Sequence, residues 1–290
     1  MNARTRCDLH MHTFYSDGRA SPRELVAHAA SMGLRTIAIT DHDTAQGARE
    51  GILVAEQYGI AVLPAIEFTC RWDACNAPPG QTDIDVLGYC LDLENARFRA
   101  MEQAALADIH ARANTCCALL TAGGYPIALD EVFAQNPRYA GMMPLMDALI
   151  HKGHAQDSSA AIAAIDVHWR QVRPSALTIG EIITTIHAAG GAAVLAHPTL
   201  VPWETGWLSA QGLAVLVDMG LDGIEIHHHR LDGAARVRFS SLAQQFSLLI
   251  TGGSDEHGWP SGFPHMGNER VTQEMADALA ARARERSLAR

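Results

Sequence analysis

Short apolar runs and longer amphipathic stretches alternate along most of the chain. Stretches with the periodicity of a helix separate most of the runs of β-type residues. These runs lie at residues 35–39, 60–66, 84–90, 192–196, 222–226 and 248–251. Ser21 and Glu24 predict a helix start, because a serine cap followed three residues later by glutamate satisfies the first amide groups of a helix. The alternation predicts parallel strands joined by helices, and therefore an α/β fold.

One long segment interrupts this alternation. Residues 94–120 have a continuous Ala-rich helical pattern, 142–151 and 158–169 have shorter ones, and no strand pattern occurs between 125 and 172. We expect residues 97–173 to be a helical insertion, and residues 1–96 and 174–290 to form the α/β domain. Caps over a rigid scaffold commonly determine which substrate is bound, so we expect the insertion to contact the substrate.

Histidines and acidic residues follow the apolar runs, at the end where each run stops. His10 and His12 come first, and if residues 7–11 form a strand both imidazoles point to the same face. Similar residues follow the later runs, namely Asp41, His42, Asp43, Glu67, His197, Glu225, His227, His228, His229, Asp255 and His257. The carboxyl ends of strands share one edge in α/β folds, so these groups are expected to meet, and such groups typically bind divalent metals.

Composition narrows the class of partner. The chain has 290 residues and a net charge of -10, and an acidic chain is a poor general binder of long nucleic acid. Lys152 is its single lysine, whereas arginine, which suits bidentate phosphate contacts, is frequent. The expected partner is a small-molecule phosphate ester. Without a long apolar run, a signal-peptide pattern or a C-x-x-C pair, we expect no membrane span, reduced cysteines and a cytoplasmic protein.

The order of the polar motifs is characteristic. Residues 8–18 read D-L-H-M-H-T-F-Y-S-D-G, and T-D-H-D-T, I-E-F, A-H-P and G-S-D-E-H-G follow in that order. This series resembles the PHP (polymerase and histidinol phosphatase) family of metal-dependent phosphoesterases, and it spans nearly the whole chain. The resemblance implies a distorted (β/α)7 TIM-like barrel with a helical insertion, which hydrolyses phosphate esters with a metal-activated water or hydroxide.

The resemblance also implies two divalent metal ions, Mn, Fe or Zn, with a third ion left open. The first ion would be bound by His10, His12, Glu67 and Asp255. The second would be bound by Asp17, His42 and His257, and Glu67 could bridge the two. A third would need Asp85 or His197. Catalytic roles are expected for His197, Asp255 and His257.

Two positions depart from the family pattern. Asp85, in I-D-V-L-G-Y, stands where many relatives have histidine, and residues 141–144 lack the Arg and His of a G-R-P-H-type motif. The expected substrate contacts are Arg138, Tyr139, His228 and Arg230. Arg138 would contact a second phosphate and Tyr139 could stack on a base or sugar, although both could equally be ordinary surface residues. Which residue of the triplet 227–229 reaches the site is left open, and Asp41 and Asp43 are expected to orient His42 or its neighbours.

The leading functional hypothesis is a phosphatase of the 3′,5′-nucleoside bisphosphate type. The alternatives are a cyclic sugar-phosphate phosphodiesterase and an exonuclease acting on short oligonucleotides. A non-catalytic regulatory module is disfavoured because the series of candidate ligands is intact. An amidohydrolase is disfavoured because the bridging lysine usual in that class would have to be Lys152, which lies inside the insertion.

Overall fold

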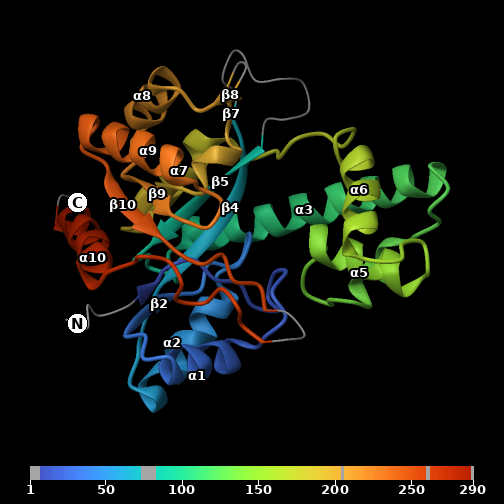
Figure 1. Cartoon of the computed structure of the whole chain (residues 1–290), viewed down its shortest axis with the longest axis horizontal. Helices are drawn as coiled ribbons and strands as arrows, with labels where there is room; N and C mark the ends of the chain where they lie inside the picture. The colour runs from blue at the N-terminus through green and yellow to red at the C-terminus, as the bar shows by residue number, and fades with distance from the viewer. Residues whose placement is uncertain (1–6, 73–82, 204–205, 259–261, 289–290) are drawn as a thin grey trace.

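The computed structural model describes residues 7–72, 83–203, 206–258 and 262–288. A small parallel sheet is formed by β1 (Cys7–Asp8), β2 (Thr36–Ala38) and β3 (Ala61–Leu63), in that order. The crossovers are α1 (Pro22–Ser31) and α2 (Gln46–Tyr58), which lie beside this sheet in Figure 1. The predicted capping box is present at the start of α1, and the predicted β-α-β-α-β beginning of the chain is confirmed.

A larger sheet has the strand order β10-β9-β6-β5-β4. The strands β6 (Ala192–Leu195), β9 (Gly223–His227) and β10 (Leu249–Gly252) are parallel to one another. In contrast, β5 (Asp83–Tyr89) is antiparallel to both of its neighbours, β6 and β4 (Ala65–Arg71). Two prolines followed by a glycine at 78–80 predict an irregular loop over residues 71–81, of which only Arg71 and Trp72 are among the described residues.

The two sheets meet at two seams. At one seam the Leu9 amide donates to Gly252 O at 3.3 Å, and at the other the Asp43 amide donates to Glu67 O at 2.7 Å. Within the described ranges the sheets nevertheless remain separate and open, so the mixed α/β class is confirmed and the closed (β/α)7 barrel is not. The regular alternation breaks because Pro64 alone separates β3 from β4, and β5 then runs antiparallel.

Helices cover the outside of the larger sheet (Figure 1). These are α7 (Ile179–Ala188), α8 (Ala210–Asp218), α9 (Gly233–Gln245) and α10 (Gln273–Leu288). A short 3-10 turn, η1 (Pro198–Leu200), and the two-stranded β7 (Pro202–Trp203) and β8 (Gly206–Trp207) follow β6. No helix in the described part of the chain combines the length and apolar character needed to cross a membrane.

The segment after β5 is helical, as expected. It contains α3 (Ala96–Ala122), α4 (Leu129–Phe133), α5 (Met142–His151) and α6 (Ser158–Trp169). The later helices gather at the far end of α3, away from the sheets (Figure 1), around a hydrophobic cluster whose fully buried members all fall between Ala113 and Val172. The division into a domain at 1–96 and 174–290 and an insertion at 97–173 stays a prediction.

Candidate metal centre

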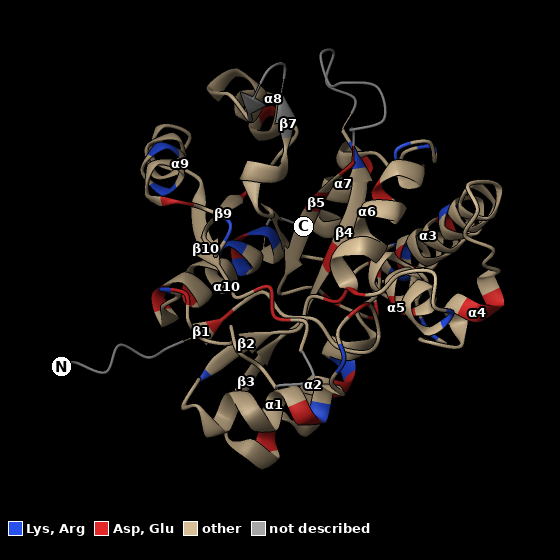
Figure 2. Ribbon diagram, turned by 45° about the vertical axis from the view of Figure 1, so that its right-hand side comes forward, with Lys and Arg blue, Asp and Glu red and all other residues tan. Residues whose placement is uncertain are grey.

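The residues predicted to bind metal lie together where the two sheets meet. Most of them lie on loops that follow the strands, whereas Glu67 lies within β4 and Asp85 within β5. Figure 2 shows acidic residues gathered in this central region. The nine predicted ligands are His10, His12, Asp17, His42, Glu67, Asp85, His197, Asp255 and His257. In each of them a side-chain nitrogen or oxygen lies within 4.0 Å of an oxygen or nitrogen of another member. Their roles as ligands remain predictions.

Glu67 is at the centre of the cluster and is completely buried. Its Oε2 lies 3.0 Å from His10 Nε2 and 3.3 Å from His12 Nε2. Asp255 Oδ1 approaches the same two nitrogens, at 3.5 Å from His10 and 3.2 Å from His12. Both histidines of the first motif therefore meet the same pair of carboxylates. The strand predicted at 7–11 is only partly present, because β1 ends at Asp8 and Met11 forms an isolated bridge, so the two histidines lie beyond the strand.

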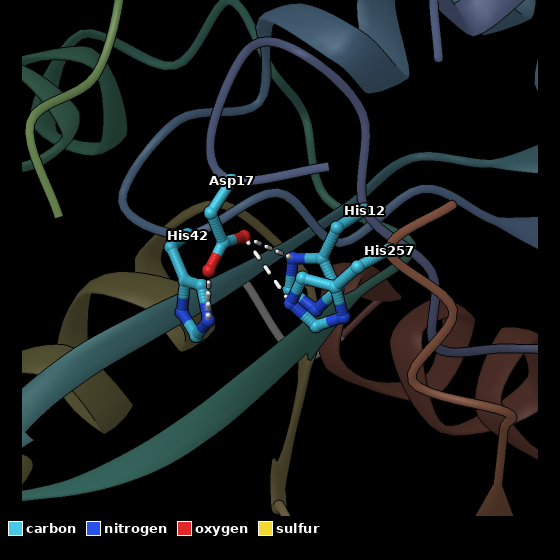
Figure 3. Close-up of side chains that lie close together, drawn as sticks. All are labelled: His12, Asp17, His42 and His257. Carbon is cyan, nitrogen blue, oxygen red and sulfur yellow. Dashed lines mark ion pairs between the residues drawn. The ribbon is translucent and has the colours of Figure 1, made fainter. Parts of the chain in front are cut away.

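Asp17 links a second group of predicted ligands (Figure 3). Its Oδ1 lies 3.3 Å from His257 Nε2 and 3.6 Å from His12 Nδ1, while its Oδ2 lies 3.9 Å from His42 Nε2. The rings of His12 and His257 are stacked, with 4.2 Å between their centroids. One donor atom from each of these four residues lies within 4.8 Å of the others, a separation that a single metal ion can span.

His197 and Asp85 extend the cluster on another side. His197 Nε2 lies 3.1 Å from Glu67 Oε1 and 3.8 Å from Asp85 Oδ2. Asp85 is held by Thr69, whose hydroxyl donates to it at 2.6 Å. Both positions suggested for a third ion therefore lie beside Glu67.

The backbone of the site is strained. Among described non-glycine residues, positive φ angles occur at Asp43 (59°), His197 (24°) and Asp255 (54°), as well as at Cys90 and Ser247. Left-handed backbone is unfavourable for residues with a Cβ and persists only where the surrounding structure enforces it. Three of these five positions are in or next to the cluster, so strain is concentrated where the ligands are aimed.

The triplet 227–229 sends one residue into the cluster. His228 is completely buried, and its Nε2 lies 3.4 Å from Asp255 Oδ2. His229 instead donates from Nδ1 to Ser254 O at 3.2 Å and stacks on the His228 ring at 4.4 Å. The open question is answered in favour of His228 for the cluster.

Several buried acidic residues form hydrogen bonds with the predicted ligands or with the loops that carry them. Glu225 accepts a hydrogen bond from His10 Nδ1 at 3.0 Å and another from the His197 amide at 2.9 Å. The sequence analysis placed Glu225 at a strand end and gave it no role. In the structure it lies inside the buried strand β9, next to Ile224, and a carboxylate inside an apolar strand was the available sign that it has a buried partner. Asp41 and Asp43 were expected to orient His42 or its neighbours. Asp41 accepts from the amide and hydroxyl of Thr13, at 2.6 and 2.7 Å, and Asp43 accepts from the amide of Thr69 at 3.1 Å.

The charges of the cluster are strongly coupled. Burial alone would raise the pKa of Glu67, but the charges of His10 and His42 outweigh it and hold that pKa well below its usual value. Burial opposes the charged form of His12, yet the neighbouring Asp255 and Glu67 raise its pKa to about 10. In the metal-free protein, protonated histidines therefore serve as the cations that neutralise the buried carboxylates.

The donor set fits bound metal ions. His12 Nε2, His42 Nδ1 and His228 Nε2 are buried and, among the described residues, have no hydrogen-bond partner. These atoms lie near carboxylates without the alignment of a hydrogen bond, which is the arrangement expected if a cation lies between them. Buried polar atoms without partners are costly, and metal coordination would satisfy them.

A cleft of about 470 Å³ opens onto the cluster. Six of the predicted ligands line it, namely Asp17, His42, Asp85, His197, Asp255 and His257, together with His229, Arg230 and His265. The remaining wall is apolar and includes Met142, Met143, Ile162 and Leu200. Of the predicted substrate contacts, Arg230 lines this cleft.

Arg138 and Tyr139 lie elsewhere. Tyr139 is buried, and its ring is nearly parallel to that of His42 with 6.4 Å between centroids. Arg138 lines a second, smaller pocket, and its guanidinium group lies 4.4 Å from the centre of the Phe14 ring. Their roles in binding substrate stay predictions.

The family can be assigned by comparison with known proteins. The model of the PHP domain matches residues 8–160 of this chain. The chain belongs to the PHP family. The resemblance inferred from the order of the motifs is thereby confirmed.

Several PHP proteins are similar over most of their length. A protein of Haemophilus influenzae named 5′-3′ exoribonuclease is 30% identical over 90% of this chain and 92% of its own length. The phosphoribosyl 1,2-cyclic phosphate 1,2-diphosphodiesterase of Eggerthella lenta is 27% identical, with 90% and 97% covered. The 3′,5′-nucleoside bisphosphate phosphatase of Chromobacterium violaceum is 25% identical, with 90% of each chain covered. All three names describe phosphoric ester hydrolases, which is the expected class.

A solved structure has the same fold. It is a protein of Bifidobacterium adolescentis assigned as a metal-dependent phosphoesterase, with a TM-score of 0.83 and 29% identity over 95% of this chain and 96% of its own. The similarity extends through the helical segment as well as the sheets, because nearly the whole of both chains is covered.

Proposed function

We propose that this chain hydrolyses phosphate esters of small nucleotides or sugars, as a phosphatase of the 3′,5′-nucleoside bisphosphate type. The observation that carries the proposal is that Asp17, His42 and Asp255 of the buried cluster face a cleft of about 470 Å³. Pockets of this size suit small ligands of about the size of a nucleotide. The names of the similar proteins support the reaction class.

Two divalent ions are proposed at the cluster. Mixed imidazole and carboxylate donors suit Mn, Fe or Zn better than Mg alone. The first would be bound by His10, His12, Glu67 and Asp255, and the second by Asp17, His42 and His257. Bound there, such ions neutralise phosphoryl oxygens, activate a water and stabilise the leaving oxygen. A third ion would use Asp85 or His197, which flank Glu67.

The remaining residues of the cleft are proposed to hold the substrate. Arg230 can bind two phosphate oxygens at once through its planar guanidinium group. His228, beside Asp255, and His197, beside Glu67, are proposed to contact the reacting phosphate, where His197, Asp255 and His257 carry the catalytic roles. The apolar wall, to which Ile162 belongs, would contact the base or sugar and exclude water.

The helical segment 97–173 is proposed to be the insertion that completes this cleft. Met142, Met143 and Ile162 come from α5 and α6 and line the cleft together with the ligands. Substrate choice would then depend on this segment, while the residues from the two sheets provide the reaction.

A phosphodiester substrate is the second candidate. The relative named 5′-3′ exoribonuclease and the relative named cyclic phosphate diphosphodiesterase each cover 90% of this chain. The net charge of -10 disfavours long nucleic acid, so a short oligonucleotide or a cyclic sugar phosphate is the form of this alternative. A non-catalytic module remains disfavoured, because the predicted ligands converge on one cluster.

The test combines metal analysis with a substrate panel. Protein purified without chelator should contain about two transition-metal ions per chain. The Mn-loaded protein should hydrolyse at least one of a 3′,5′-nucleoside bisphosphate, a 5′-phosphorylated dinucleotide, a cyclic sugar phosphate and p-nitrophenyl phosphate. Asp255→Asn should abolish this activity, whereas Asp218→Asn, at the exposed end of α8, should not. No bound metal after Mn loading, or no hydrolysis of any ester, would overturn the proposal.

A further inference from the structure

The loop that carries Asp17 is tied to the helical segment. Residues 14–17 form a turn ahead of α1, and Ser16 directly precedes Asp17. The side chain of Asn136, which lies between α4 and α5, donates to the carbonyl oxygens of Phe14 and Ser16 at 3.0 and 2.5 Å. Asn136 and Ser16 are 120 residues apart in the chain, so only the tertiary structure brings this amide onto the turn.

The two carbonyl groups of the turn depend on Asn136. Among the described residues, neither of them accepts a hydrogen bond from any other group. Backbone polar groups that are shielded from water need a partner, and here a single amide nitrogen supplies both. It therefore holds the turn at two points, one of which is the residue before Asp17.

Asn136 is itself held in the orientation that these bonds require. Its Oδ1 accepts from the Arg138 amide at 3.0 Å, which leaves the nitrogen of the side-chain amide to face the turn. The guanidinium group of Arg138 lies 4.4 Å from the centre of the Phe14 ring, so the two segments are also packed against each other. The bridge is therefore a built contact between the helical segment and the turn.

A second polar link joins the same two segments. Arg19 pairs with Asp147 of α5 at 2.8 Å, but the side chains are 38% and 28% exposed. Exposed ion pairs contribute little, because water and salt screen them. Of the two links, the Asn136 bridge is the one expected to restrain the turn.

The first group of predicted ligands is held in a different way. His10 is bonded to Glu225 of β9 at 3.0 Å, and the Asp255 amide donates to His10 O at 2.9 Å. Glu67 lies within β4. These contacts belong to the two sheets and their loops, so a change in the helical segment should affect the group around Asp17 first.

We propose that Asn136 is a positioning residue for the second metal ion, the one assigned to Asp17, His42 and His257. The inference rests on the proposed function, which places an ion there. Asn136 is not a ligand. It holds the turn so that the two carboxylate oxygens of Asp17 face His257 and His42. The helical segment then has two tasks, since it lines the cleft and also sets the affinity for one of the ions.

The experiment measures Mn binding to the full-length protein, stripped of metal by a chelator, with isothermal titration calorimetry. In Asn136→Ala one site should keep its wild-type affinity, while the other weakens about tenfold to a hundredfold, as when a group that orients a ligand is removed. Asn136→Asp keeps the oxygen that accepts from Arg138 but loses both donors, so it should weaken the same site at least as much. Gln135→Ala is the matched control and should bind Mn as wild type does. Gln135 is exposed, lines the same smaller pocket and makes no side-chain hydrogen bond within the described ranges.

A double variant identifies which site has weakened. Asp17→Asn should lose one of the two Mn sites, and adding Asn136→Ala to it should change the affinity of the remaining site less than twofold, because both changes act on the same ion. Activity gives an independent readout. For an ester that wild type hydrolyses, kcat of Asn136→Ala should fall at low Mn and recover as Mn is raised, with KM for the ester unchanged.

The outcomes separate this inference from the proposed function. Wild-type affinity at both sites of Asn136→Ala overturns the inference, and so does equal weakening of both sites, which would show a general role in folding. Wild-type binding by Asn136→Asp overturns it as well, because the bond to Arg138 would then be the one that matters. A wild type that binds fewer than two Mn ions overturns both proposals. A wild type that binds two Mn ions but hydrolyses no ester overturns the proposed function alone, since calorimetry still decides the role of Asn136.

Discussion

His10 and Glu225 are 215 residues apart in the chain and joined by a hydrogen bond of 3.0 Å between Nδ1 and Oε1, both side chains being completely buried. On the other side of the ring, His10 Nε2 lies 3.0 Å from Glu67 Oε2, so both ring nitrogens face carboxylates in the metal-free protein. Because Nδ1 faces Glu225, Nε2 is the atom that faces Glu67 and Asp255. An acid placed in this way orients a ligand histidine and raises its basicity.

Replacing this acid should weaken metal binding without removing a ligand. Glu225→Gln keeps the shape of the side chain but loses the charge that supports His10, so we expect the affinity for Mn at the cluster to fall about tenfold to a hundredfold. Isothermal titration calorimetry, in which Mn is added to protein that a chelator has stripped of metal, measures this affinity. Glu274→Gln, on the exposed face of α10, is the control and should bind Mn as wild type does. Equal affinities in all three proteins would show that Glu225 has no influence on the metal.

Removing a ligand should have a larger effect on activity. Asp255 Oδ1 approaches two histidines of the cluster, so Asp255→Asn and His12→Ala should each lower kcat by at least about a hundredfold, as loss of charge stabilisation at a reacting centre does. The far-ultraviolet circular dichroism spectrum should stay that of the wild type. Near-normal turnover in either variant would show that the ligand assignment is wrong.

The sequence predicted which polar residues lie together better than it predicted what surrounds them. His10, His12 and Asp255 were recognised as candidates because they accompany or follow apolar runs of the strand type, and the order of the motifs added the other candidates. The role of Asp41 was not predictable, because its partner Thr13 lies in a loop whose path only the tertiary structure determines. The fold was predicted to class level, while the antiparallel direction of β5 was not, since periodicity does not report strand direction.

Gly253 shows how closely the backbone approaches a ligand. A Cβ atom at this position would collide with the backbone and Cβ of His10. Gly253→Ala should therefore displace His10 or the loop to Asp255, and a displacement near 1 Å can lower activity by about a hundredfold. Activity and the melting temperature should both fall. Gly180→Ala, in α7 with open space around it, is the control and should leave the melting temperature unchanged or raise it slightly.

Asp222 is a structural counterpart to the site, on the outside of the larger sheet. It is buried and accepts hydrogen bonds from Arg282 and Arg286 of α10, both with contacts at 2.9 Å, and from His187 of α7 at 3.0 Å. Asp222→Asn would leave the guanidinium groups of Arg282 and Arg286 facing a neutral group. We expect the free energy of unfolding to fall by about 3 kcal/mol, as when one partner of a buried pair is lost, measured by urea denaturation.

The control for this prediction is an exposed acid that pairs with one of the same arginines, Arg282. Glu285 lies 3.6 Å from Arg282 and is largely exposed, so Glu285→Gln should change the free energy of unfolding by less than about 0.5 kcal/mol. Similar losses in both variants would mean that burial of Asp222 has no special effect. Activity per folded molecule should be unchanged in both, because neither residue reaches the cleft.

The stability of the metal-free protein should depend on pH in a direction set by the histidines. Burial disfavours protonation of His12 and His197, but adjacent carboxylates outweigh it and raise their pKa values from 6.5 to about 10 and about 9. A group whose pKa is raised on folding stabilises the protein fully below its unfolded pKa, and this contribution is lost as pH rises through the folded value. The melting temperature of the metal-free protein should therefore fall between pH 6.5 and 9.5.

With saturating Mn, the increase in melting temperature over the metal-free protein should grow with pH over the same range, because ligands must lose their protons to bind metal. His12→Gln should make the metal-free slope shallower, and a chelated wild type whose melting temperature stays constant or rises up to pH 9.5 would contradict the charge state assigned to the cluster.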